Sequence, residues 1–96
     1  MKLFANIYTD LETDELALGL GVSHWHSIKM DAHHYQFTAK NVSLNLEGSK
    51  ELLLFGQIDL PLKEIDEWVA SLVELSIHFT LDLHGDEARL IRRYCQ

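Results

Sequence analysis

Residues 77–84 alternate strictly between apolar and polar side chains, and this pattern limits the folds open to the chain. The apolar positions are Ile77, Phe79, Leu81 and Leu83. Successive side chains of a strand point to opposite faces of a sheet, so the period of two predicts a strand with one buried face and one solvated face. Such strands are typical of antiparallel sheets that are covered on one side.

Several other segments have the composition of strands. Residues 3–8, 35–40, 42–46 and 52–60 are apolar or alternate, and a short strand is expected inside the irregular segment 22–34. Gly56 interrupts the run 52–60, which predicts a bulge or a close backbone approach. Residues 88–95 suit a helix face or a return strand. The tight turn that precedes them favours the return strand.

Two helices are expected. The stronger follows Pro61, because Ile65, Trp68, Val69, Leu72 and Val73 fall at the spacing of an amphipathic helix. Proline suits a first turn, since the N–H that it lacks would have no helical partner there. A shorter helix of about two turns should begin after a cap at Asp10 or Thr13, and Gly19 and Gly21 should end it.

These elements predict one α+β domain over residues 1–96. Its mostly antiparallel sheet should have about five to six strands, with two helices on one face. In the C-terminal half, the order strand–helix–strand–strand is compatible with the split β-α-β arrangement of ferredoxin-like folds.

The chain is strongly acidic, with fifteen acidic and eight basic residues and a formal net charge of −7. Binding to nucleic-acid phosphates needs a basic patch, so we expect no nucleic-acid partner. A basic protein partner fits this charge better, although acidity also serves solubility alone. No apolar run approaches the roughly 20 residues of a membrane span, so no membrane is expected. The lone Cys95 and the lack of a signal-peptide pattern favour the cytoplasm.

The acidic residues near the two expected helices are the first candidates for partner binding. They are Asp10, Glu12, Asp14 and Glu15 near the first helix, and Glu64, Glu67 and Glu74 near the second. An ordinary solvated helix face is the alternative interpretation. Trp25 joins this set as an interface anchor if it is exposed, whereas packing against the sheet is the competing explanation.

The histidines are a second kind of candidate. His24 and His26 would point to the same face of a strand, and His33 and His34 follow closely, so the four could ligate a metal ion. His78, Asp82 and His84 share one strand face, where an aspartate could orient an imidazole. The sequence has no nucleophile in an activating motif and no phosphate-binding loop. We therefore expect no catalytic residue, no cofactor and no enzymatic activity.

Size, charge and the lack of catalytic motifs resemble the class of small acidic bacterial binding proteins, which includes toxin-neutralising immunity proteins and phage-encoded inhibitors. This resemblance implies a non-catalytic module that neutralises a basic partner, such as a nuclease toxin. A histidine-rich metal- or ligand-binding regulatory domain is the alternative. The sequence leaves the oligomeric state open.

Overall fold

The computed structural model describes residues 1–22 and 24–96 of the chain. Its two helices are α1 (Thr13–Leu20) and α2 (Leu62–Leu72). Its strands are β1 (Lys2–Thr9), β2 (His26–Asp31), β3 (His34–Ala39), β4 (Val42–Ser49), β5 (Glu51–Ile58), β6 (Ile77–His84) and β7 (Leu90–Cys95). A short 3-10 turn at Asp86–Ala88 lies between β6 and β7.

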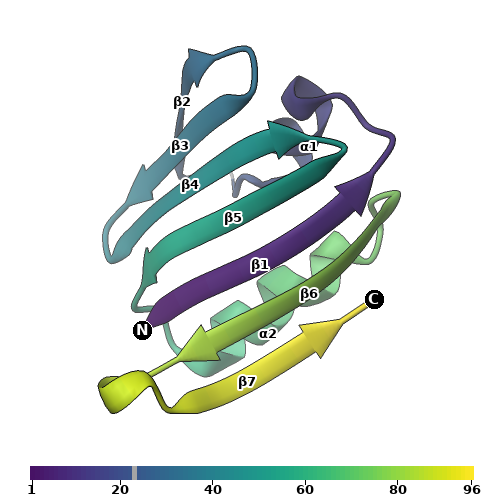
Figure 1. Ribbon diagram of the computed structural model, residues 1–96. Helices are drawn as coiled ribbons and strands as arrows, with labels where there is room; N and C mark the ends of the chain where they lie inside the picture. The colour runs from purple at the N-terminus through teal and green to yellow at the C-terminus, as the bar shows by residue number, and fades with distance from the viewer. Residues whose placement is uncertain (23) are drawn as a thin grey trace.

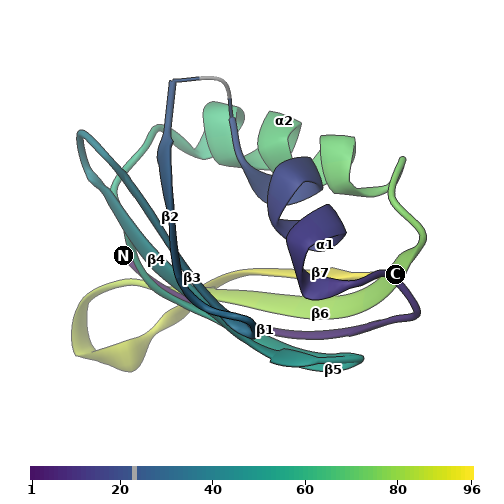
Figure 2. The ribbon, with the colours of Figure 1, turned by 90° about the horizontal axis from the view of Figure 1, so that it is seen from above.

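All seven strands form one antiparallel sheet in the order β2-β3-β4-β5-β1-β6-β7. Both α-helices lie on the same side of this sheet, and the described residues form no α-helix on the opposite side, which we call the helix-free side (Figures 1 and 2). The predicted α+β class is confirmed. The sheet has seven strands instead of five to six, since the irregular segment supplies a full strand, β2. Residues 90–95 form β7, which confirms the favoured return strand.

The centre of the sheet contains two split β-α-β units. Strand β1 is antiparallel to both β5 and β6, so these two run parallel to one another, joined by α2. Strand β5 is likewise antiparallel to both β1 and β4, so β1 and β4 run parallel to one another. In the chain, α1 and the β2–β3 hairpin connect β1 to β4. The order β6-β1-β5-β4 is therefore the split arrangement predicted from the C-terminal half, and it extends to the first strand.

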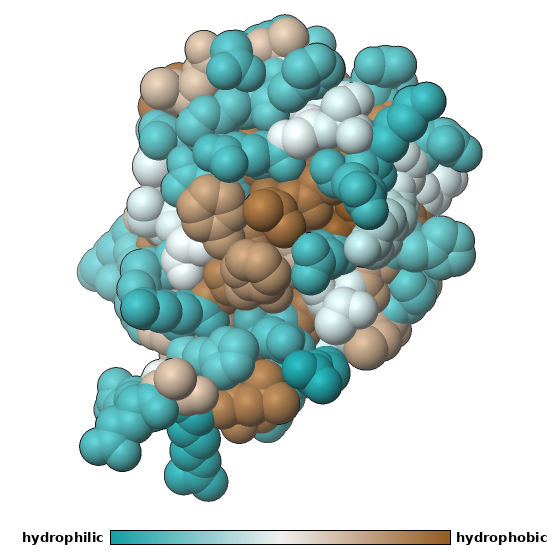
Figure 3. Space-filling model, in the orientation of Figure 1, coloured by the Kyte–Doolittle hydropathy of each residue, from teal (hydrophilic) through white to brown (hydrophobic). Residues whose placement is uncertain are grey.

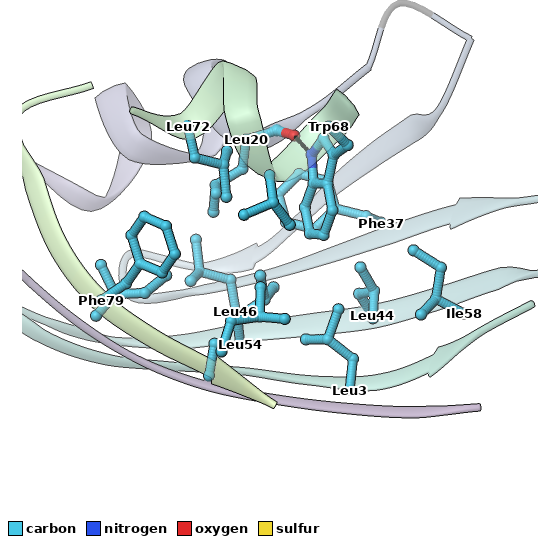
Figure 4. Close-up of a cluster of buried hydrophobic side chains, with 14 of the residues drawn as sticks. Leu3, Leu20, Phe37, Leu44, Leu46, Leu54, Ile58, Trp68, Leu72 and Phe79 are labelled. Carbon is cyan, nitrogen blue, oxygen red and sulfur yellow. Dashed lines mark hydrogen bonds between the residues drawn. The ribbon is translucent and has the colours of Figure 1, made fainter. Parts of the chain in front are cut away.

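The core fills the space between the sheet and the helices (Figure 4). Trp68 and Leu72 from α2 and Leu20 from α1 lie over the sheet side chains. The latter include Leu3, Phe37, Leu44, Leu46, Leu54, Ile58 and Phe79. Leu54 and Ile58 are fully buried, so the apolar run 52–60 contributes its even-numbered residues to this core.

Helix α1 begins differently from the prediction. Its N-cap is Glu12, whose backbone N–H donates to the Glu15 carboxylate at 3.4 Å. Thr13 is buried, and its hydroxyl donates to the Gly48 carbonyl at 3.0 Å, so it links α1 to β4 instead of capping the helix. Asp10 lies outside the helix.

The two glycines near the end of α1 have different roles. Gly21 is the C-cap, as predicted, whereas Gly19 lies inside the helix. A Cβ atom on Gly19 would come within 2.7 Å of the Leu75 side chain. Gly19 therefore permits a close approach to the segment after α2.

Gly56 confirms the predicted close backbone approach. Its φ is +147°, and a Cβ atom there would lie 2.1 Å from the Ser43 carbonyl oxygen on β4. The pairing of β5 with β4 and with β1 continues through this residue without a shift, so the predicted alternative of a bulge is wrong.

Candidate functional site

Charge is divided unevenly between the two sides of the molecule. The helices and their flanking segments, residues 10–20 and 59–76, contain nine of the fifteen acidic residues and one of the eight basic residues. Their formal charge is therefore −8, which leaves +1 for the rest of the chain. All six histidines also belong to the rest. The net charge of the protein is thus carried by the helix side.

We use the name acidic helix surface for seven of the nine carboxylates on this side, since the other two, Asp59 and Asp66, pair with the Met1 amino group and with Arg92. The seven are Asp10, Glu12, Asp14, Glu15, Glu64, Glu67 and Glu74. Glu64 lies in the first turn of α2, Glu67 one turn later, and Glu74 just beyond the C-cap Val73. Among the residues that the structure describes, none of these carboxylates except Asp14 forms an ion pair. They remain available to a partner.

Asp14 has a role within the fold. Its carboxylate pairs with the Lys29 ammonium, 3.1 Å away, and accepts a hydrogen bond from the Tyr35 hydroxyl. The bond from Tyr35, followed by that from Lys29, lowers the pKa of Asp14, because both stabilise the ionised form. Asp14 thereby links α1 to the β2–β3 hairpin and is less available than its neighbours.

Trp25 is part of the core, so its predicted role as an exposed interface anchor is wrong. Its side chain is 8% exposed. The ring centroid lies 5.4 Å from that of Trp68 and 6.4 Å from that of Phe37. The competing prediction, that Trp25 packs against the sheet, is confirmed by its contact with Phe37 of β3. Its indole N–H has no hydrogen-bond partner in the described part of the chain.

The four candidate metal ligands do not come together. His26 pairs with Thr38 at one end of the β2–β3 hairpin, whereas His34 pairs with Asp31 at the other end. Five residues of strand separate the two ends by roughly 17 Å. His24 precedes β2, and His33 lies in the turn between β2 and β3. Within the described ranges, no group of three or more histidine, cysteine or acidic residues could hold a metal ion.

The second histidine set lies on the side of the sheet away from the helices. Asp82 does not orient an imidazole there. Both of its carboxylate oxygens accept hydrogen bonds from the Arg93 guanidinium, at 2.8 and 3.0 Å. This bidentate contact lowers the pKa of Asp82. His78 and His84 occupy the same face of β6, two residues away on either side of Thr80 and Asp82.

The helix-free side also carries an apolar patch that the sequence did not single out. Phe4 and Tyr8 from β1 are 45% and 50% exposed, and Leu53 from β5 is 38% exposed. Phe55 adjoins them as the cross-strand neighbour of Phe4. Figure 3 shows this side, with apolar residues gathered at its centre and hydrophilic residues around them. The sequence signal for this patch is that residues 3–8 carry bulky side chains on both faces of the strand. Strand β1 has at least two strands on each side in the sheet order, so it does not lie at an edge of the sheet.

A hollow of about 970 Å³ lies at one end of this patch. Phe4 and Phe55 are among its lining residues, together with Lys2 and His84. The loop after β6, which bends away from the helix side, forms its far wall (Figure 2).

No protein-family model matches the chain, and neither a curated protein sequence nor a solved structure is significantly similar to it. Within the described residues, neither helix has the length and apolar composition needed to cross a membrane.

Proposed function

We propose that this protein is a non-catalytic, cytoplasmic binding module that uses the acidic helix surface to neutralise a basic protein partner. An inhibitor or immunity-type protein directed against a nuclease toxin is the form that we favour. The observation that supports it is the formal charge of −8 on the helix side, combined with carboxylates that have no ion-pair partner among the described residues.

A surface of one sign attracts a partner of the opposite sign over about 8–10 Å at physiological ionic strength. Such attraction raises association rates and excludes partners of the same sign. A basic cleft that binds nucleic acid presents the charge that this surface complements. Carboxylates held on two helices would occupy such a cleft in place of phosphates.

Two apolar side chains support a contact surface over a purely solvated one. Leu18 on α1 is 85% exposed, one turn beyond Asp14 and Glu15. Val73 at the end of α2 is 56% exposed and directly precedes Glu74. Apolar groups beside charged ones supply the dry contacts that stabilise a complex after electrostatic encounter.

The test compares two triple variants with the same change in net charge. Glu64→Gln/Glu67→Gln/Glu74→Gln neutralises the acidic helix surface. Glu47→Gln/Asp86→Asn/Glu87→Gln neutralises three exposed acids outside the helix side. Each tagged protein captures partners from its native cell extract at about 0.05 M and 0.5 M salt, and the bound proteins are identified by mass spectrometry.

We expect the wild type and the second variant to retain one basic protein at low salt and to release it at high salt. The first variant should bind it at least about tenfold more weakly, because three negative charges that attract the basic partner are removed from the contact surface. Equal loss from both variants would mean that only net charge matters. Binding unaffected by salt and by either variant would also refute the proposal.

A further inference from the structure

The helix-free side of the sheet has a regular arrangement across its two central strands. On β1, the side chains of Phe4, Asn6 and Tyr8 point to this side, because they alternate with the buried residues of the same strand. Phe4 lies opposite Phe55 of β5, and Tyr8 lies opposite Glu51. The apolar patch is therefore centred on the line between β1 and β5.

The two flanks of this patch differ in charge. On the flank formed by β4 and β5, Glu47 and Glu51 are exposed. On the flank formed by β6, His78 and His84 lie on the same side of the sheet, beyond Tyr8 and Lys2 respectively. Asp82 lies between these two histidines, and its bidentate contact with Arg93 compensates its charge. An acidic flank and a histidine flank thus face each other across an apolar centre.

We propose that this side binds a second copy of the chain, face to face, about a two-fold axis that runs parallel to the strands between β1 and β5. Rotation about that axis exchanges β1 with β5 and β4 with β6. Phe4 of each copy then lies over Phe55 of the other, and Glu51 lies over Tyr8 with His78 beside it. By the same registers, Glu47 of one copy lies over Thr80 of the other, next to His78 on the same strand face.

This self-complementarity favours a second copy over a different protein. A two-fold interface must be complementary to itself, with each contact made twice. The exchange places Phe4 on Phe55, and it places the Glu51 carboxylate near the Tyr8 hydroxyl and the His78 imidazole. The same rotation makes each of these contacts twice. Aligned packing of two sheets at about 30° is a common arrangement of antiparallel faces.

The whole face is large enough for an interface of standard size. The two larger extents of the molecule, 33 and 26 Å, limit this face to roughly 860 Å². An interface that buries the approximately 800 Å² per partner of standard size would therefore use most of the face, beyond the apolar patch itself. The loop after β6 projects on the same side and would border the interface (Figure 2).

Sedimentation equilibrium of the wild-type protein between about 1 and 200 μM tests the proposal, because interfaces of this size commonly reach micromolar affinity. Phe4→Lys places a charge at the centre of the patch. Ile28→Lys is the matched control, since Ile28 is 48% exposed on the same sheet but lies on the edge strand β2, outside the exchanged strands. Circular dichroism checks the fold of each variant.

We expect a dimer for the wild type and for Ile28→Lys, and at least about tenfold weaker dimerisation for Phe4→Lys. Leu53→Lys repeats the test from β5 if Phe4→Lys does not fold. A wild-type monomer throughout this range overturns the proposal and leaves the patch to another protein. Equal dimerisation of all folded variants also overturns it.

A charge exchange tests the orientation of the two copies. Glu51→Lys should weaken dimerisation, because its ammonium would meet His78 of the second copy. Adding His78→Glu to Glu51→Lys should restore dimerisation, since opposite charges would then be near one another. A double variant that dimerises no better than Glu51→Lys alone would contradict the proposed axis.

Discussion

The indole N–H of Trp68 donates a hydrogen bond of 2.9 Å to the backbone carbonyl of Leu20, 48 residues earlier in the chain (Figure 4). This carbonyl belongs to the last turn of α1, where carbonyls have no intrahelical partner. The bond therefore fastens the end of α1 to the buried face of α2. Trp68→Phe should lower the free energy of unfolding by about 2–4 kcal/mol, through the unsatisfied carbonyl and the lost volume. Urea denaturation measures this change.

Trp25→Phe is the matched control for that prediction. Trp25 and Trp68 are nearly equally buried, at 8% and 7% exposure, and their rings are in contact. The Trp25 indole N–H has no partner in the described part of the chain, so its removal breaks no described hydrogen bond. We expect Trp25→Phe to cost about 1–2 kcal/mol less than Trp68→Phe. Equal costs would show that the bond to Leu20 contributes nothing.

Gly56→Ala should destabilise the protein strongly. The new Cβ atom would lie 2.1 Å from the Ser43 carbonyl oxygen, and the φ of +147° is unfavourable for alanine. A loss of about 3 kcal/mol or more is expected, because neither strand can move without breaking its pairing. Gly21→Ala is the control, since its nearest contact would be an ordinary 3.5 Å and its φ is −68°. Thermal and urea denaturation of both variants provide the comparison.

The fold was largely predictable because its signals are local. Alternation at residues 77–84 and the stripe that contains Ile65 and Trp68 each depend on neighbours within one element. The segment 22–34 was harder to interpret, because β2 lies at the sheet edge and all six of its residues are exposed. A strand without a buried face has no alternation to reveal it. Its position follows instead from pairing with β3.

Stability should fall at high pH through Tyr94. Burial and a hydrogen bond to the Asp66 carboxylate raise the pKa of Tyr94 from 10.0 to about 12. The native state therefore keeps the hydroxyl proton at pH values where the unfolded chain loses it. This contribution is complete below pH 10 and is lost as the pH rises to about 12. Urea denaturation at pH 9 and pH 11 should show a smaller decrease for Tyr94→Phe than for the wild type. Equal decreases would contradict the assignment.

Zinc should have little effect on this protein. The histidine pairs lie at opposite ends of the β2–β3 hairpin, so zinc could engage two imidazoles at most from either end. Structural zinc sites use four ligands. We expect about 50 μM zinc to shift the melting temperature no more in the wild type than in His33→Gln/His34→Gln. A large shift that this variant abolishes would revive the regulatory metal-binding alternative.

The candidate site was predictable only in part, for a physical reason. Acidic residues reveal themselves by composition, and helical periodicity assigns Glu64 and Glu67 to an outer face. Exposure of an aromatic residue depends on what covers it. Trp25 lies in a polar stretch and is nevertheless buried by Trp68, whereas Phe4 lies in an apolar stretch and is exposed. Such differences are set by tertiary packing, which local sequence does not encode.

Glu74 should show opposite effects on stability and binding. It follows the C-cap of α2, where the helix dipole is negative, and no basic residue lies in the last turn. Glu74→Lys should therefore raise the free energy of unfolding by about 0.3–1 kcal/mol at low salt, and less at high salt. The same change should weaken binding of the basic partner, because it places a positive charge on the acidic helix surface. Glu74→Gln should give intermediate values of both. If Glu74→Lys stabilises the protein without loss of binding, this end of α2 lies outside the contact with the basic partner. The binding surface would then consist of Glu64, Glu67 and the carboxylates near α1.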